Sequence, residues 1–575
     1  MFQEKLCDNI QFPHSNIIEN KMASSHHAAV LILQGNKTYG KLKNKYYYRC
    51  VPNSKNVKEG LLLYNINNLS WNKFQKNKYI IIEETDVIIQ GHPLYKMTET
   101  IGDVDVLENF YIYNAYCKDV YFNDFKAFNT IAKKFKNLQQ QQQIIDNLTM
   151  KCKEDRTHHD SIISIDPIGS IDIDDAFGIH INDNGQLVLS IYIANVPMYI
   201  DEMNAFSVLS RQVSTIYFPN GKRPMIPAVL SDNLCSLIEG KDRFALVCDI
   251  TLEKSVLKTM EKTNIVSVSF TNCKMRVAKN YSYDDVEHLK QDQTYTMTKR
   301  IVEVLNSHEN SYFEQDTEFD SHSVISYLMV FMNHQAAQLL AKEKRGIFRS
   351  ITEVAKKTKT KEKVPNEIKQ FVRGWNSDGG GKYTTQPLTH DLLNLNVYTH
   401  VTSPIRRIVD LVNSIEIQHA LGLFSFSETE EGNEGGNEGG NEEGGNEEVG
   451  NEEGGCEQEK RAAIKFCKDC KKDVFIDEVN RQMKSIRKVQ TECNLLHLFS
   501  GGVGVIDKSY IGYICEKNVN NDKTKYVVYL HELNLISTYN SKEDLEMYGK
   551  YMFQLYHFKD KSSFKEKIKL CLKNK

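Results

Sequence analysis

Four aspartates within ten residues constrain this chain more than any other feature of its sequence. They lie in the segment SIISIDPIGSIDIDDAFGIH at residues 161–180. The four are Asp166, Asp172, Asp174 and Asp175. The apolar, β-branched runs on both sides predict two strands, and a proline and a glycine predict the break between them. On extended backbone Asp172 and Asp174 would share one face and Asp175 the other, while the loop returns Asp166 toward them.

Four like charges held this close repel one another, so a fold keeps them together only with positive charge between them. Oxygen ligands without Cys or His favour Mg²⁺, or Mn²⁺, over zinc. The alternative is a solvated acidic turn, against which the two buried-looking strands argue. A calcium loop fits poorly because the D-x-D-x-D-G spacing and the distal Glu are missing. The pattern therefore predicts a magnesium site.

A second motif, VYTHVTSPIRRIVDLVNSIEIQHAL, occupies residues 397–421. Its pattern predicts a helix capped by Thr402 or Ser403, with the following proline at the first helical position. Arg406 and Arg407 would then lie in the first turn, where cations are unfavourable unless an anion also binds. A helix N-terminus with two guanidinium groups predicts a phosphate site, and arginines paired with surface acids are the alternative. The residues expected in the core are Ile408, Leu411, Val412 and Ile415.

Length and composition indicate several domains in one intracellular chain. The 575 residues exceed the size of a single core. No run of eighteen or more apolar residues predicts a membrane span, and the first residues do not resemble a secretory signal. The thirteen cysteines, irregularly spaced, predict free thiols in a reducing compartment, so we expect a cytoplasmic location. Cys467 and Cys470 form a close pair, but a zinc site would need two further ligands.

The net charge of −3 is unevenly distributed. Residues 427–459 hold thirteen Glu and no Lys or Arg, so removing them leaves +10 for the remainder of the chain. Such an excess is compatible with a polyanionic partner. The Asn/Gly/Glu repeat of this segment cannot form a core and is expected to be a disordered surface insertion. Mimicry of RNA by the repeat is an alternative.

Short strands separated by turn residues predict small β-barrels at both ends of the chain. At the N-terminal end, residues 1–22 are expected to be a flexible arm, followed by strands from His26 onward. The Lys and Tyr residues of KTYGKLKNKYYYRC are typical of a nucleic-acid-binding barrel, and an ordinary barrel with surface tyrosines is the alternative. Residues 123–150 are predicted to be helical, and short strands return after residue 501.

From Glu154 to Leu237 the chain resembles the RNB catalytic domain of the ribonuclease II and ribonuclease R family. The family has an Asp followed by three more at +6, +8 and +9, as in the four aspartates above. STIYFPNGKRPMIPAVLSDNLCSL (214–237) is similar to its SVYLP…IPMLP…LS…LCSL segment, and HVTSPIRR is close to its HFTSPIRR motif.

The resemblance implies an α+β multidomain fold. Its expected parts are the arm (1–22), cold-shock-like OB-folds with a connector (23–150), an α/β RNB catalytic domain (151–500) that contains the acidic insertion (427–459), and an S1-like OB-fold (501–575).

The resemblance also implies roles for particular residues. Asp166 and Asp175 would chiefly ligate Mg²⁺, while Asp172 and Asp174 complete the centre and support a second metal and the attacking water. Arg406 would clamp a phosphate beside the metal. Further residues expected to contact RNA are Arg407, His400, Thr402, Ser403 and Tyr283. Tyr283 would stack on the terminal base, with a core or capping tyrosine as the alternative, and Tyr281 is a second candidate.

The activity implied is that of a processive 3′→5′ exoribonuclease that converts single-stranded RNA to nucleoside 5′-monophosphates. We expect a monomer that binds single-stranded RNA and no membrane. The chain departs from the family where it has Ser326 and Tyr327 in place of paired acids, Ser414 and Ile415 in place of a His-Arg pair, and no clear counterpart of a late Glu. A catalytically silent RNA-binding scaffold and a metal-dependent DNA nuclease are the rival hypotheses.

Overall fold

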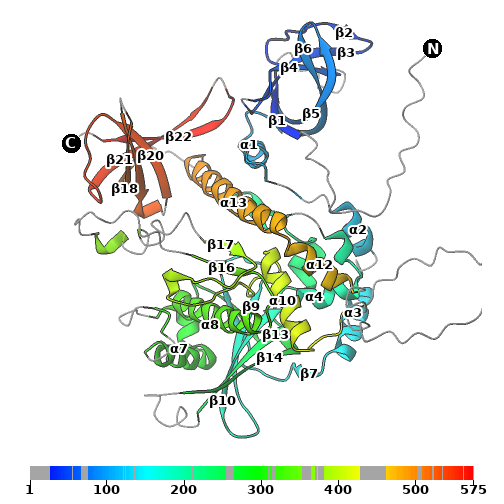
Figure 1. Cartoon of the computed structure of the whole chain (residues 1–575), viewed down its shortest axis with the longest axis vertical. Coiled ribbons are helices and arrows are strands. Elements are labelled where there is room, and N and C mark those ends of the chain that lie inside the picture. The colour runs from blue at the N-terminus through cyan, green and yellow to red at the C-terminus, as the bar shows by residue number, and fades with distance from the viewer. Residues whose placement is uncertain are drawn as a thin grey trace, which may run out of the picture. The chain divides into compact units, whose positions relative to one another are not determined.

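The structure of the chain is a computed structural model, and its described residues fall into two units (Figure 1). One unit comprises residues 1–118 and 560–565, and the other comprises residues 119–559 and 566–575. The described residues are 26–573 except 55, 66–74, 121, 123–124, 134–136, 210–211, 254–263, 308–310, 314–318, 352–363, 369–371, 373–380, 428–460, 501–507, 521–522, 534 and 561–562. The predicted arm and nearly all of the predicted acidic insertion lie outside them.

The first unit contains a closed six-stranded sheet. Its strands are β1 (His26–Leu31), β2 (Lys41–Leu42), β3 (Lys45–Pro52), β4 (Gly60–Tyr64), β5 (Lys78–Ile89) and β6 (His92–Asp103). Their order is β1-β5-β6-β4-β3-β2, and an additional β1–β3 pairing closes the sheet. Helix α1 (Leu107–Tyr116) follows, with the ring of Tyr113 stacked 4.1 Å from that of Tyr79. The predicted β-barrel is confirmed. Lys37 and Lys41 each lie 5.3 Å from the ring centroid of a neighbouring tyrosine.

A seven-stranded sheet forms the centre of the second unit. Its order is β15-β8-β9-β10-β13-β14-β7. The bounds are β7 (Glu154–Arg156), β8 (Ile163–Asp166), β9 (Asp175–Ile181), β10 (Leu187–Ala194), β13 (Asp242–Leu252), β14 (Ile265–Arg276) and β15 (Lys279–Ser282). Strand β10 is buried along its whole length, as expected for an apolar central strand. The strands are antiparallel except for the β7–β14 and β8–β15 pairs.

Helices of this unit pack on the central sheet and around α10 (Ile408–Ala420). Apolar residues of α7 (Gln293–Asn306) and α8 (Ser321–Lys342) share one core with β8, β9, β10 and β13. Helix α10 packs against α8, α4 (Val196–Glu202) and α12 (Ala462–Cys470), and α13 (Asp473–Ser500) lies beside α12 (Figure 1). The predicted helical stretch at 123–150 forms α2 (Lys126–Ala132) and α3 (Leu138–Lys151). None of the helices in the described residues is long and apolar enough to cross a membrane.

Helix α10 begins later than the sequence predicts, at Ile408 rather than at the proline after Ser403. The predicted cap and first-turn placement of Arg406 and Arg407 are therefore wrong. Arg407 is extended, with φ −137° and ψ 129°, because it forms an antiparallel bridge with Ser214. The Thr215 amide also donates to the Arg406 carbonyl at 2.9 Å. The Arg407 amide still donates to the Ser403 carbonyl at 3.0 Å, but the pairing with a distant segment holds Arg407 extended, so the regular helix starts one residue later. The four residues expected in the core are all buried.

The last part of the second unit is a five-stranded antiparallel sheet with the order β20-β19-β18-β21-β22. Its strands are β18 (Ser509–Asn520), β19 (Lys523–Leu530), β20 (Leu535–Ser541), β21 (Lys550–Lys559) and β22 (Glu566–Leu572). They enclose a separate apolar core that includes Ile514, Val528 and Phe553. The predicted α+β multidomain class, with small β-barrels at both ends and an α/β centre, is confirmed.

Candidate active site

The acidic segment joins two neighbouring strands of the central sheet. Strand β8 ends at Asp166 and β9 begins at Asp175, and the two strands pair at Ile163 and Phe177. The loop between them turns at Pro167, whose carbonyl accepts from the Ser170 amide at 3.0 Å. Both flanking strands are as predicted. The connection returns the chain so that aspartates at its two ends share one edge of the sheet.

Asp174 is the most deeply buried of the four aspartates, with a side chain that is 2% exposed. Its carboxylate accepts from the Ile405 amide at 2.8 Å and from Arg406 Nε at 3.2 Å. Burial raises the pKa of Asp174 to about 7, although Arg406 and the Ile405 amide act in the opposite direction. A charged hydrogen bond thus joins the acidic loop (166–175) to the basic turn, the segment 403–407 that carries Arg406 and Arg407.

Asp166 and Asp175 form no ion pair with a cation of the described residues, unlike Asp172 and Asp174. Burial raises the pKa of Asp166 to about 6, although the Ser164 hydroxyl donates to it at 3.0 Å. The pKa of Asp175 is also raised, first by burial and then by the charges of Asp166 and Asp174. Repulsion between these carboxylates is the condition that a bound cation would relieve.

Asp172 is held by a hairpin that sequence reasoning did not assign to the site. The hairpin pairs β11 (Ile216–Phe218) with β12 (Gly221–Arg223). Tyr217 donates its hydroxyl to Asp172 at 2.6 Å, and Lys222 Nζ lies 2.9 Å from Asp172 and 2.8 Å from Asp232. Tyr217 and Lys222 are register partners, so they share a face. The signal was present in IYFPNGKR, where a strand-favouring run is followed by the turn residues Pro-Asn-Gly.

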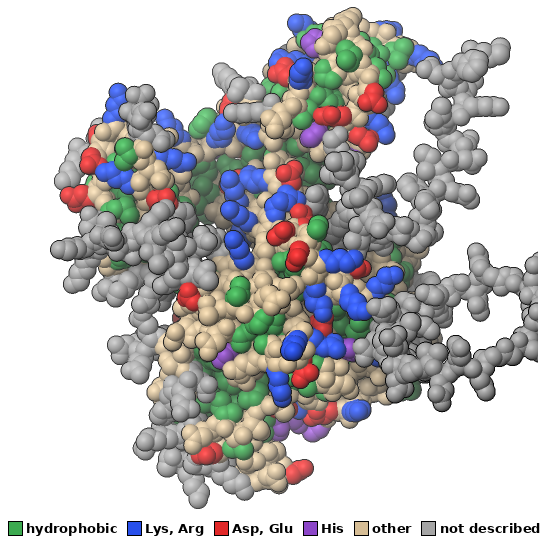
Figure 2. Space-filling view, in the orientation of Figure 1, with side chains coloured by type: hydrophobic (Ala, Val, Ile, Leu, Met, Phe, Trp, Pro, Cys, Tyr) green, Lys and Arg blue, Asp and Glu red, His purple; other side chains and the backbone are tan. Residues whose placement is uncertain are grey.

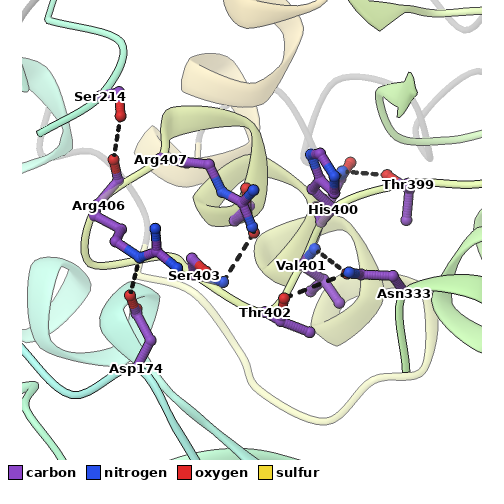
Figure 3. A network of polar contacts seen from close by, with 12 residues as sticks. Asp174, Ser214, Asn333, Thr399, His400, Val401, Thr402, Ser403, Arg406 and Arg407 are labelled. Atoms are coloured by element: carbon purple, nitrogen blue, oxygen red, sulfur yellow. Dashed lines mark hydrogen bonds and ion pairs between the residues drawn. The ribbon is translucent and has the colours of Figure 1, made fainter. Parts of the chain in front are cut away.

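The basic turn presents its two arginines to different partners (Figure 3). Arg406 is directed to Asp174, whereas Arg407 Nη2 lies 2.7 Å from Asp410 Oδ1. The Ser214 hydroxyl holds the Arg406 carbonyl at 2.8 Å. The Arg406 side chain is still 44% exposed, so donors of its guanidinium remain open to a ligand beside the aspartates.

Thr402, Ser403 and His400 support the turn from within. Both Thr402 and Ser403 are buried, and Asn333 donates to the Thr402 hydroxyl at 3.4 Å. The Ser403 amide donates to Asp410 at 2.8 Å, and His400 Nδ1 lies 2.7 Å from the Tyr383 hydroxyl. Burial, then the nearby arginines, lower the pKa of His400, which favours the neutral ring. Contact of these three side chains with RNA stays a prediction.

Tyr283 lies beside the acidic loop, as a base-stacking tyrosine would have to. Its amide donates to the Asp166 carbonyl at 3.0 Å, and its ring stacks on His322 at 3.8 Å with a 10° interplanar angle. Burial, then the charges of Asp175 and Asp166, raise the pKa of its phenol. Tyr281 instead donates its hydroxyl to Asp292, the N-cap of α7, at 3.0 Å. Tyr283 is therefore the better placed of the two candidates.

The donor set suits a hard divalent ion only in part. Within the described residues no group of three or more His, Cys, Asp or Glu side chains is arranged to hold an ion. Mg²⁺ is commonly held by one or two carboxylates together with water and substrate phosphates. Asp166 and Asp175 fit that pattern, whereas Asp172 and Asp174 already contact Lys222 and Arg406. Ligation by all four aspartates stays a prediction.

Comparison with known proteins shows a match to the model of one protein family. Residues 153–309 and 292–422 match the model of the RNB domain. The chain is 26% identical to ribonuclease R of Chlamydia trachomatis over 327 residues, which span 45% of each protein. It is 33% identical to exosome complex exonuclease RRP44 of Mus musculus over 144 residues, 24% of this chain and 15% of the relative. The matched segments span less than half the length of these curated relatives.

Solved structures show the same architecture. The RNase R of Mycoplasma genitalium, solved in complex with double-stranded RNA, covers 95% of both chains with a TM-score of 0.63 and 16% identity. Yeast Ssd1, described as a pseudonuclease, covers 90% of this chain and 65% of its own, with a TM-score of 0.54 and 13% identity. At these identities the likeness shows the fold.

Proposed function

Because this chain carries an RNB domain of the ribonuclease II and ribonuclease R family, we propose that it is a divalent-metal-dependent exoribonuclease. It shortens single-stranded RNA from the 3′ end. Water attacks the last phosphodiester, the bond from phosphorus to the 3′ oxygen of the preceding nucleotide breaks, and that oxygen takes a proton. The products are a nucleoside 5′-monophosphate and an RNA shorter by one residue. The catalytic domain is proposed to span residues 151–500.

One observation carries this proposal: the acidic loop and the basic turn meet at a single pair of side chains. Asp174 contacts Arg406 at 3.2 Å, and Asp166 and Asp175 lie in the same loop without an ion pair in the described chain. A divalent ion would supply positive charge to the aspartates, and a phosphodiester would supply negative charge to the arginine. Asp166 and Asp175 would hold the ion, which when bound lowers the pKa of water and offsets phosphate charge.

The remaining side chains bind the RNA or position the groups that do. The half-exposed guanidinium of Arg406 donates to non-bridging phosphate oxygens, which it can contact at two points. Tyr217 and Lys222 fix the rotamer of Asp172 and neutralise part of its charge. Tyr283 stacks on the terminal base, an interaction that contributes about 1–3 kcal/mol and tolerates any base. The barrels at both ends of the chain are proposed to bind the RNA upstream.

The second candidate is a catalytically silent protein that binds RNA through the same shell. It is favoured by the ion pairs of Asp172 and Asp174 and by the lack, within the described chain, of a three-ligand metal group. All four aspartates of the motif are present, which favours the enzyme.

Incubation with oligonucleotides separates the candidates. The purified protein is mixed with 5′-labelled single-stranded RNA or DNA of one sequence, in Mg²⁺ or in excess chelator. The enzyme gives a ladder of RNA products that shorten stepwise and none in chelator. RNA binding without a ladder in any metal supports the silent protein, and equal shortening of DNA supports the DNA nuclease.

A further inference from the structure

A second group of charges lies beside the basic turn. It is the arginine cluster of Arg349, Arg407 and Arg487. Arg349 lies on β16 (Phe348–Ser350), which pairs with β17 (Lys382–Thr384) so that Arg349 is opposite Tyr383. Its guanidinium lies 5.1 Å from the centroid of that ring and donates to the Gly381 carbonyl.

Helix α13 brings the third arginine to the cluster. The Asn480 side chain accepts from the Tyr383 amide at 2.8 Å and donates to the Tyr383 carbonyl at 2.9 Å, which fixes α13 against β17. Arg487 follows two turns later on the same helix and is exposed. In the view of Figure 2, Lys and Arg side chains gather over this helix.

The cluster carries more positive charge than its surroundings balance. Arg407 is paired with Asp410 at 2.7 Å, but Arg349 and Arg487 form no ion pair among the described residues. Burial lowers the pKa of Arg349, the Tyr383 phenol acts in the opposite direction, and the charges of Arg487 and Arg407 lower it further. Arg407 Nε is also buried and has no hydrogen-bond partner in the described part of the chain. Like charges and open donors of this kind are relieved by an anion.

We propose that Arg349, Arg407 and Arg487 form a second phosphate site, which binds a backbone phosphate of the RNA next to the one held by Arg406. This inference rests on the proposed function, because it takes RNA as the ligand. Planar guanidinium groups suit phosphate oxygens, since each can donate two parallel hydrogen bonds.

The course of the chain explains how the two sites follow one another. Arg407 is extended, and the side chains of Arg406 and Arg407 reach different partners (Figure 3). Arg406 faces Asp174 and Arg407 faces Asp410. A strand that ends at the aspartates would therefore place one phosphate beside Arg406 and the next beside Arg407. A released nucleoside monophosphate has similar chemistry and is the other source of phosphate to be tested.

The test measures binding of single-stranded RNA in chelator, where cleavage is absent. A 5′-labelled oligouridine is prepared with one uncharged methylphosphonate at each of the eight linkages nearest the 3′ end. The full-length protein is compared with Arg349→Gln, Arg487→Gln and Lys488→Gln, the last an exposed neighbour on α13 outside the cluster. We expect one linkage whose neutralisation weakens binding about tenfold in the wild-type protein and in Lys488→Gln, but has little further effect in Arg349→Gln and Arg487→Gln. Loss of one phosphate contact should also reduce the slope of log K against log salt by about 0.7.

Gly381→Ala displaces Arg349 without removing a charge, because an added Cβ would lie 2.7 Å from the guanidinium carbon, as well as 2.5 Å from Ile351 Cγ1. Gly381→Ala should therefore behave as Arg349→Gln does. Because Arg487 is on the surface, Arg487→Gln keeps the test valid if the variants at buried positions unfold. Identical linkage profiles and salt slopes in the wild type and Arg487→Gln would overturn the proposal. The proposal would also be overturned if uridine monophosphate inhibits RNA binding by the wild type and not by Arg487→Gln, while the two proteins have the same linkage profile. The site would then bind the released nucleotide and not the RNA backbone. If RNA is shortened normally but no linkage responds differently in the arginine variants and the wild type, the second site alone is rejected. If one linkage does respond differently but RNA is not shortened, the enzyme alone is rejected. Absence of any RNA binding rejects both.

Discussion

The guanidinium of Arg406 and the carboxylate of Asp174 form an ion pair at 3.2 Å between segments that are 232 residues apart in the sequence. The pair is asymmetric: Asp174 is 2% exposed and Arg406 is 44% exposed. A buried acid therefore positions a cation whose other donors face outward. The geometry predicts that Arg406 acts on a ligand, while Asp174 orients it and contributes to the acidic loop.

Arg406→Ala should lower the rate of RNA cleavage by more than about a hundredfold, because it removes the phosphate donors at the reacting linkage. Arg406→Lys keeps the charge but loses the planar fork, so it should recover only a small part of the rate. The measurement is single-turnover cleavage of 5′-labelled RNA. Arg276→Ala, at an arginine of similar exposure on β14, is the matched control and should keep the wild-type rate. A wild-type rate in Arg406→Ala would reject the clamp.

Tyr217→Phe should weaken the hold on Asp172 without changing the size of the side chain. The lost hydrogen bond is 2.6 Å long and ends on a charged acceptor, so we expect a loss of about 1–3 kcal/mol in the free energy of unfolding. Cleavage should slow by about tenfold, because Asp172 then relies on Lys222 alone for orientation. Urea unfolding and single-turnover rates check the two effects. Unchanged values for both would remove Tyr217 from the site.

The pKa values predict how stability depends on pH in the absence of metal. The pKa values of Asp166 and Asp174 are raised to about 6 and about 7, so the folded protein binds protons near pH 7 that the unfolded chain does not. The free energy of unfolding should therefore fall as the pH rises from 6.5 to 8, by at most about 1.4 kcal/mol per pH unit for each proton released. His159 and His390, whose pKa values are lowered to about 4, act in the opposite direction, because the unfolded histidines lose their protons near pH 6.5. Most of their effect falls below that pH.

Mg²⁺ should cancel this dependence and raise the melting temperature more at pH 8 than at pH 6.5. Asp175→Asn removes one of the repelling charges, so the metal-free variant should be more stable than the wild type at pH 8 and gain little from Mg²⁺. Calorimetry at both pH values, in chelator and in Mg²⁺, provides the comparison. If the variant and the wild type show the same pH dependence and the same response to Mg²⁺, the charges of the loop do not interact as described.

Much of this site could be predicted because its information is local. The spacing of the four aspartates, the flanking strands β8 and β9, and the buried face of α10 all follow from patterns within about twenty residues. The start of α10 could not be predicted in this way. Its first residues satisfy the rules for a cap, but the bridge between Ser214 and Arg407 joins segments far apart in sequence.

The same limit explains why Tyr217 and Lys222 were missed. The strand-favouring run before Pro-Asn-Gly predicts a hairpin, but nothing in the local sequence indicates that Asp172 lies opposite the face shared by Tyr217 and Lys222. The arginine cluster is a similar case, since Arg349, Arg407 and Arg487 come from three separate segments. Pairing between distant segments, rather than propensity, places these side chains.

The proposed function places the reaction of the RNA end at the four-aspartate loop. The direct measurement compares wild type, Asp174→Asn and the exposed-turn control Asp183→Asn on 5′-labelled single-stranded RNA in Mg²⁺, with RNA affinity measured in chelator. We predict stepwise shortening from the 3′ end by the wild type and by Asp183→Asn, and no shortening by Asp174→Asn although its RNA affinity stays within about threefold of wild type. Shortening at the wild-type rate by folded Asp174→Asn protein would show that the RNA end does not react at this loop.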